Sequence, residues 1–261
     1  MVKHCEQPSV DASSSALIKV SMRIKLLTAL LTFGLLVGCA RSPVTPVQQP
    51  PVARVVVVPV APIDKMHTEN KGIPLGVLWQ SLADRIKSSD FNERMEATRK
   101  DMGPKLTAAL VRQLTARGYE AQVVEGASER AAQSAIDESK LPPTEAVLRV
   151  YLNEVGMFSA RFSRDYVPRV NLSAYLVRGE TEDSLYSETL YYGADATNNK
   201  ASWSVPANPD HHWSSFNELF EHPQEVAQSY DHAVNALAAR IAQNIRAQVS
   251  PGAVVVRSAG P

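Results

Sequence analysis

The chain has 261 residues, of which 44% are hydrophobic, and its 27 basic and 27 acidic side chains give a formal net charge of +0. This balance gives the whole molecule no field that favours nucleic acid or an anionic surface, so nucleic-acid binding is set aside. The length suffices for one domain with a sizeable core and not clearly for two.

The first residues, Met1–Ser21, are polar and show no hydrophobic periodicity. We interpret them as an over-extended start, with Met22 as the true initiator. On this interpretation Cys5 is absent from the protein, and Cys39 remains of the two cysteines in the sequence.

Residues Met22–Cys39 have the pattern of a signal peptide. Arg23 and Lys25 form a short positive region, and an apolar run, Leu26–Leu36, follows that is short for a permanent membrane span. The ending, Leu36-Val37-Gly38-Cys39, resembles the lipobox of bacterial lipoproteins. This resemblance implies that Cys39 receives a diacylglyceryl group and becomes the first residue of the mature chain. The alternatives are an uncleaved membrane anchor or a buried helix.

The next segment, Ala40–Ala53, is rich in proline and lacks an apolar period, which predicts an extended tether independent of the fold. At about 3.1 Å per residue it spans roughly 40 Å. In lipoproteins of Gram-negative bacteria, Asp directly after the acylated cysteine tends to retain the protein in the inner membrane. Ala40 occupies that position, so the resemblance implies the outer membrane, facing the periplasm. With Cys39 acylated, no intramolecular disulfide is possible.

A single domain is expected over residues 54–250, and residues 251–261 are expected to be a flexible tail. The β-branched run Arg54–Val60 predicts a central strand that ends near Pro59. Leu75–Ile86 has helical spacing, with Trp79 as a core anchor.

The strongest helical pattern in the first half covers Asn92–Arg117, and Gly103-Pro104 predicts a break or kink within it. Gly118 is expected to end the helix, and Tyr119–Glu125 follows as a strand. This joint resembles the N-terminal α/β units of periplasmic lipoproteins, among them the curli-secretion and penicillin-binding-protein-activator lipoproteins.

After a short predicted helix, Ser128–Ser139, three segments alternate apolar and polar residues as strands do: Glu145–Phe158, Val167–Arg178 and Leu185–Tyr192. They predict an antiparallel meander with one solvated face, and the long helix Gln224–Val249 is expected to cover its apolar face. Strands separated by helical crossovers pair in parallel, so the fold class is α/β (α+β) with a mixed sheet.

The segment Ala194–Glu221 is predicted to be a long loop, and long loops in compact domains are usually functional or disordered. Its aromatic and histidine side chains are the candidate surface for a partner: Trp203, His211, His212, Trp213 and Phe216. A loop that packs on its own domain is the alternative, and we expect Trp213 to be buried and Trp203 exposed. Adjacent histidines lack the spacing that preorganises metal ligands, so no metal is assigned.

No common catalytic motif is present, neither G-x-S-x-G nor a P-loop, G-x-G-x-x-G or H-E-x-x-H, so no residue is assigned a catalytic role and no cofactor is expected. Two classes of function remain. The first is a lipid-anchored binding or scaffold module whose partner is an envelope protein or a second copy of the chain. The alternative is an envelope enzyme whose site is too scattered to show as a motif.

Replacement of Cys39 tests the first step of this interpretation. Cys39→Ser should leave an uncleaved or unlipidated precursor, because the thioether to the diacylglyceryl group forms on this sulfur. The intact mass of membrane-extracted protein measures it, and a mature N-terminus elsewhere that carries no lipid would contradict it.

Overall fold

The computed structural model describes residues 51–69, 88–124, 144–159, 163, 165–178, 183–193 and 202–252. All of them belong to one of two compact units of the chain, Gln49–Pro261. The signal, most of the tether and the predicted helices Leu75–Ile86 and Ser128–Ser139 lie outside the described residues.

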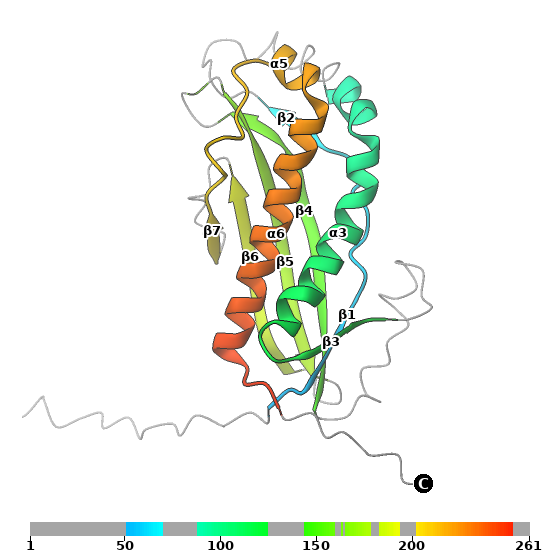
Figure 1. Cartoon of the computed structure of the whole chain (residues 1–261), viewed down its shortest axis with the longest axis vertical. Coiled ribbons are helices and arrows are strands. Elements are labelled where there is room, and N and C mark those ends of the chain that lie inside the picture. Colours follow the sequence, from blue (N-terminus) through cyan, green and yellow to red (C-terminus); the bar gives the residue numbers. More distant parts are fainter. Residues whose placement is uncertain are drawn as a thin grey trace, which may run out of the picture. The chain divides into compact units, whose positions relative to one another are not determined.

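A seven-stranded mixed sheet forms one layer of the fold (Figure 1). Six strands follow the order β3-β1-β4-β5-β6-β7, and β2 pairs with the far part of β4. β1 runs parallel to β3 and β4, whereas β4, β5 and β6 form an antiparallel meander. The bounds are β1 Arg54–Val57, β2 His67–Glu69, β3 Glu120–Val123, β4 Glu145–Ser159, β5 Tyr166–Arg178, β6 Asp183–Gly193 and β7 Trp203–Val205. The predicted fold class is confirmed.

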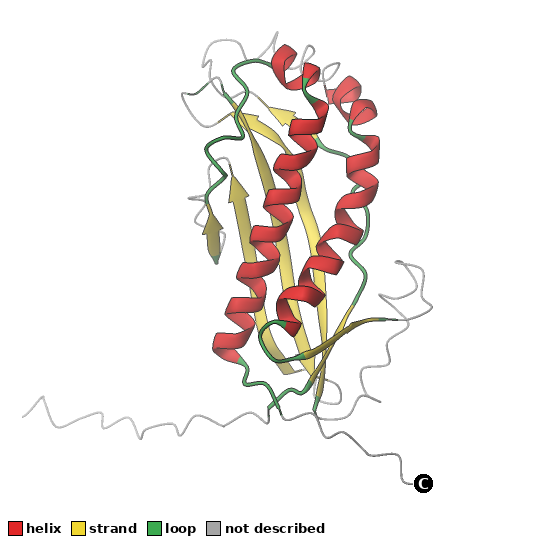
Figure 2. Cartoon of the chain, in the orientation of Figure 1, coloured by secondary structure: helices red, strands yellow, loops and turns green. Residues whose placement is uncertain are grey.

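Two long helices, α3 (Glu96–Thr115) and α6 (Pro223–Gln248), lie side by side on one face of this sheet (Figure 2). A short helix, α5 (Phe216–Glu221), precedes α6. The apolar stripe predicted for the C-terminal helix is buried, with each side chain at most 2% exposed: Val226, Tyr230, Val234, Leu237, Ile241 and Ile245. This stripe and the alternating apolar residues of the meander form a common core.

The Gly103-Pro104 pair does not break the helix, contrary to the sequence prediction, because α3 is continuous through it. A Cβ atom on Gly103 would lie 2.4 Å from the backbone oxygen of Val60, so glycine lets α3 approach the end of β1 closely. Thr107 Oγ1 accepts a hydrogen bond from Val60 N (2.9 Å) and donates one to Gly103 O (3.0 Å). This contact with β1 holds the helix together although Pro104 donates no hydrogen bond to the preceding turn.

α3 begins at Glu96, and residues 88–94 before it are also helical, with a turn at Met95 between the two pieces. Asn92, in the first piece, also fixes a neighbouring segment. Its side chain accepts a hydrogen bond from Met66 N (2.7 Å) and donates to Met66 O (2.6 Å), which fixes the chain just before β2. The end of α3 agrees with the prediction. Gly118 has φ +92°, its N–H bonds to Thr115 O, and Tyr119 N bonds to Leu114 O, the pattern of a Schellman motif.

The fold starts before Arg54 and ends after residue 250, which corrects both predicted boundaries. Val52, expected in the tether, is fully buried, and its N–H donates to Ser250 O at 3.0 Å. Gly252 N in turn donates to Val52 O at 2.8 Å. The sequence Gln-Gln-Pro-Pro-Val-Ala has no apolar period, so nothing local indicated that Val52 reaches the core.

Two truncations test this boundary. A chain that lacks residues 1–48 should melt cooperatively, whereas a chain that lacks Met1–Ala53 should melt roughly 10 °C lower, because about 2 kcal/mol of apolar burial and hydrogen bonds of about 1 kcal/mol each are lost. Thermal unfolding followed by circular dichroism measures both. As a matched control, Val52→Ala in the longer form should cost about 2 kcal/mol, and equal melting of the two truncations would contradict the assignment.

Candidate functional site

The segment Ala194–Glu221 contains regular structure where the sequence predicted a loop. In the part that is described, β7 pairs in parallel with β6, and α5 forms directly before α6. Ser215 Oγ accepts a hydrogen bond from Glu218 N (3.2 Å), and Ser214 donates to the Glu218 carboxylate from N (2.8 Å) and Oγ (2.6 Å). The Ser215-x-x-Glu218 spacing is a helix-start signal that the sequence analysis missed. These serines therefore serve to cap a helix.

Trp213 and Phe216 face the domain. Trp213 is 3% exposed, and its backbone exchanges two hydrogen bonds with Tyr166, of 2.7 and 3.0 Å. Phe216 is half-buried and packs against the core, with its ring 6.3 Å from that of Tyr166. Trp213 is therefore part of the core, and Phe216 packs partly against it.

The two histidines lie in different surroundings. The ring of His211 is 5.0 Å from that of His232 in α6, and burial, followed by the nearby His232, lowers the pKa of His211. His212 is exposed, with Nδ1 2.9 Å from the carbonyl oxygen of Pro209, a contact within a turn. Within the described ranges, no group of three His, Cys, Asp or Glu side chains is arranged to hold a metal ion.

Trp203 is the large aromatic side chain of this segment that faces solvent, at 40% exposure. It lies on β7, the last strand in the sheet order, opposite Leu190 of β6. The guanidinium of Arg240 in α6 lies 4.9 Å from the centre of its ring, a cation–π contact. Arg240 is about 12 Å along α6 from His232. The structure thus separates Trp203 from His211, and the five candidate residues do not form one surface.

The helix that carries Arg240 is fixed to the sheet by polar contacts. Glu188 in β6 accepts hydrogen bonds from Asn244 Nδ2 (2.6 Å) and Gln248 Nε2 (2.9 Å). Burial raises the pKa of neighbouring Tyr186, and the Glu188 charge raises it further. Because amides occupy both oxygens of Glu188, this carboxylate holds α6 in register against β6. We call the pair Trp203 and Arg240 the Trp203 corner.

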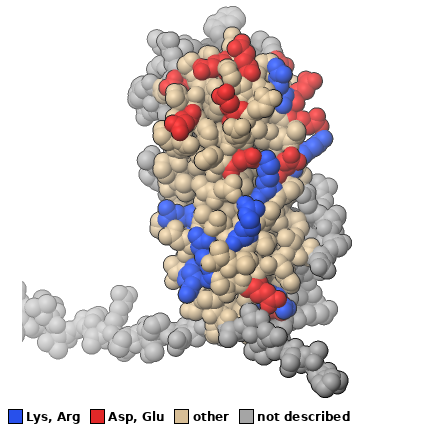
Figure 3. Space-filling model, viewed as in Figure 1, with Lys and Arg blue, Asp and Glu red and all other residues tan. Residues whose placement is uncertain are grey.

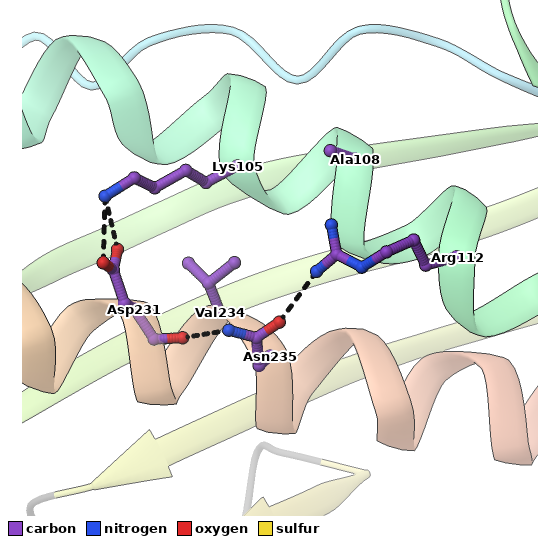
Figure 4. Close-up of a pocket in the computed structure, with 6 residues that line it drawn as sticks. All are labelled: Lys105, Ala108, Arg112, Asp231, Val234 and Asn235. Carbon is purple, nitrogen blue, oxygen red and sulfur yellow. Dashed lines mark hydrogen bonds and ion pairs between the residues drawn. The ribbon is translucent and has the colours of Figure 1, made fainter.

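A shallow groove separates α3 and α6 (Figure 4). Its volume is about 190 Å³, and Ala108 and Val234 are its apolar lining. Lys105 Nζ lies 2.7 and 2.9 Å from the two carboxylate oxygens of Asp231, and Arg112 Nη2 donates to Asn235 Oδ1 at 3.1 Å. The polar side chains that line the groove bond to one another across it, so they join the helices and leave little space for a ligand.

A second pocket of about 320 Å³ lies beside β4 and is lined by residues 61–65, His67 and residues 150–153. Tyr151 on its rim and Tyr175 on β5 are each 38% exposed, with ring centres 6.1 Å apart. Neither this pocket nor the inter-helix groove has a serine, threonine or cysteine in its lining that a histidine could activate.

Comparisons with known proteins found structural neighbours only. No protein-family model matches the sequence, and no curated protein matches it. None of the helices within the described ranges is long and apolar enough to cross a membrane.

The structural neighbours include a PelC dodecamer from Paraburkholderia phytofirmans, at 12% identity and a TM-score of 0.31, which covers 76% of this chain and 93% of that chain. Protein XCC0632 from Xanthomonas campestris is 10% identical, with a TM-score of 0.38 and coverage of 74% and 83%. Lipoprotein GNA1162 from Neisseria meningitidis is 18% identical, with a TM-score of 0.29 and coverage of 73% and 99%.

The two tryptophans should differ sharply in their effect on stability. Trp213→Ala should lower the free energy of unfolding by about 3 kcal/mol or more, because a buried ring leaves a cavity. Trp203→Ala should cost less than about 1 kcal/mol, the value of an exposed cation–π contact. Urea denaturation of both variants measures the difference, and similar losses would show that Trp203 belongs to the core.

Proposed function

We propose that this protein is a lipoprotein held in the outer membrane by a lipid on Cys39, facing the periplasm. The support is the ordered sequence pattern from the basic residues at Arg23 and Lys25 to the small residues before Cys39, followed by Ala40 and the proline-rich tether. The domain behind the tether acts as a non-enzymatic binding or scaffold module in this proposal.

The exposed ring of Trp203 is the observation that carries the partner surface. Exposing a large aromatic ring is unfavourable at about 25 cal/mol per Å² of apolar area, and the fold buries Trp213 from the same segment. Tryptophan and arginine are also the residues that most often dominate binding energy at interfaces. The Trp203 corner combines the two on a helix and a strand that are fixed to each other.

The position of Trp203 on a terminal strand adds a second means of recognition. β7 is short and pairs with β6 on one side, so its other edge is the end of the described sheet. An extended segment of a partner can add to such an edge through backbone hydrogen bonds while Trp203 supplies side-chain contact. The partner is an envelope protein or a second copy of this chain.

The alternative, an envelope enzyme, would need a deep pocket with converging polar groups. In the described parts of the chain, the inter-helix groove is closed by its own ion pair, and the carboxylate of Glu188 is held by amides. These groups are committed to structure, and they favour the binding module.

Photo-crosslinking in cells tests the Trp203 corner. A photoreactive amino acid at exposed Ser204 should give one discrete adduct, and Trp203→Ala should reduce it about thirtyfold, the effect of losing an interface residue worth 2 kcal/mol. The mass of the adduct distinguishes a second copy from another envelope protein.

Tyr175→Ala is the matched control, because Tyr175 is an aromatic of nearly equal exposure on β5. The adduct should persist in this variant. An adduct of unchanged yield in Trp203→Ala, with unchanged melting, would contradict the proposed role of the Trp203 corner. Loss of the adduct in Tyr175→Ala but not in Trp203→Ala would contradict it as well.

A further inference from the structure

The formal charge of zero conceals a separation of charge along the two helices. Residues 102–119 and 232–252, which make up the adjoining parts of α3 and α6 with the turns that follow them, contain no Asp or Glu. Their basic residues are Lys105, Arg112, Arg117, Arg240 and Arg246. Residues 209–231, at the other end of α6, contain five acidic residues and no Lys or Arg. In Figure 3 most red side chains gather at the upper end of this face, blue side chains continue below them, and one red group lies beside a blue one at the lower end.

The arginines of this basic half have neutral partners, and the Glu188 carboxylate of β6 lies against the same part of α6, bonded to Asn244 and Gln248. Lys105 alone pairs with a carboxylate, Asp231, at the border between the halves. Arg112 donates to the amide of Asn235, Arg117 donates to Gln113 and to the carbonyl of Ala239, and Arg240 stacks on Trp203. Arg246 is exposed near the end of α6. Four arginines therefore stand against the one carboxylate of Glu188 at this end of the described helical layer, which leaves it positive.

The chain enters the fold at this same end. Val52 bonds to Ser250, two residues beyond the end of α6, and Pro251 lies within van der Waals reach of Gly118, which ends α3. The tether between Cys39 and Val52 has 12 residues, residues 40–51, and spans roughly 37 Å when extended as polyproline. The tether therefore joins the domain at the basic half and not at the acidic end.

We propose that the basic half of the α3–α6 layer docks on anionic phospholipid headgroups of the membrane that holds Cys39. This proposal rests on the lipid anchor proposed above. Guanidinium groups bind phosphate oxygens through paired hydrogen bonds, and each basic side chain near an anionic bilayer improves binding about fivefold. The acidic end then points away from the headgroups, because like charge repels it.

The test uses the mature lipidated protein in phosphatidylcholine vesicles with and without phosphatidylglycerol. Because the mature chain has no other cysteine, a single fluorescent label can be placed through Gln243→Cys in the basic half or Gln228→Cys near the acidic end. A spin-labelled headgroup lipid should quench the label at position 243 and not at position 228, only in vesicles with phosphatidylglycerol. Quenching should fade as the salt concentration rises from about 0.1 to about 1 M.

Variants that remove positive charge test the docking in a second way. Arg112→Gln with Arg246→Gln should lower the ratio of docked to undocked protein roughly 25-fold, since each arginine contributes about fivefold. Lys65→Gln with Lys100→Gln removes the same charge from exposed residues elsewhere and should leave the ratio unchanged. Unaltered melting of both double variants shows that they remain folded.

The outcomes separate this inference from the anchor itself. Protein that fails to float with any vesicles would overturn the lipid anchor and, with it, the docking. Protein that floats but is quenched equally at both label positions, or without regard to phosphatidylglycerol and salt, would overturn the docking and leave the anchor standing. Quenching that appears only after an acidic protein is added would assign the basic half to a protein partner and likewise overturn the proposal.

Discussion

The burial of one face of the meander beneath α6 is the interaction on which the rest of the fold depends. Leu148, Leu172 and Leu190 point from three neighbouring strands into the core, and the stripe of α6 covers them. Most of the stability of a helix in a protein comes from packing of its apolar face, and an uncovered apolar sheet face would be a large exposed hydrophobic patch, so each element supplies the surface that the other lacks. α3 completes the layer beside α6, and at Gly103 it closely approaches Val60 and Ala61, which follow β1.

Local periodicity was enough to predict the elements of this core. The alternating residues of β4, β5 and β6 and the stripe of α6 repeat within each segment, and so the sequence showed them directly. The helix end at Gly118 could be predicted for the same reason, because a helix end depends on residues that are close in sequence. The continuity of α3 past Pro104 could not be predicted from local sequence, since it depends on a hydrogen bond between Thr107 and Val60, which are 47 residues apart. The burial of Val52 could not be predicted either, because its hydrogen-bond partners lie near the other end of the chain.

The candidate surface was predictable in part. Composition marked the segment that contains both tryptophans, and the structure separates their roles: Trp213 pairs with the backbone of Tyr166, and Trp203 stacks on Arg240. The expectation that Trp213, nearer the C-terminal helix, is buried and that Trp203 is exposed is confirmed. The separation of charge was hidden for a different reason. The net charge of the whole chain says nothing about position, whereas two parallel helices bring basic residues that are distant in sequence to one end.

The geometry at the chain entrance also determines how the domain bears a mechanical load. β1 follows Val52 at once and runs parallel to both β3 and β4, so traction on the N-terminal side draws β1 along its own axis. Its hydrogen bonds on both sides are then strained together in shear and not broken one after another. The hydrogen bonds of Val52 with Ser250 and Gly252 lie just before β1 in the chain, so the force reaches them first. This geometry favours resistance to a force that is applied on the N-terminal side of the domain.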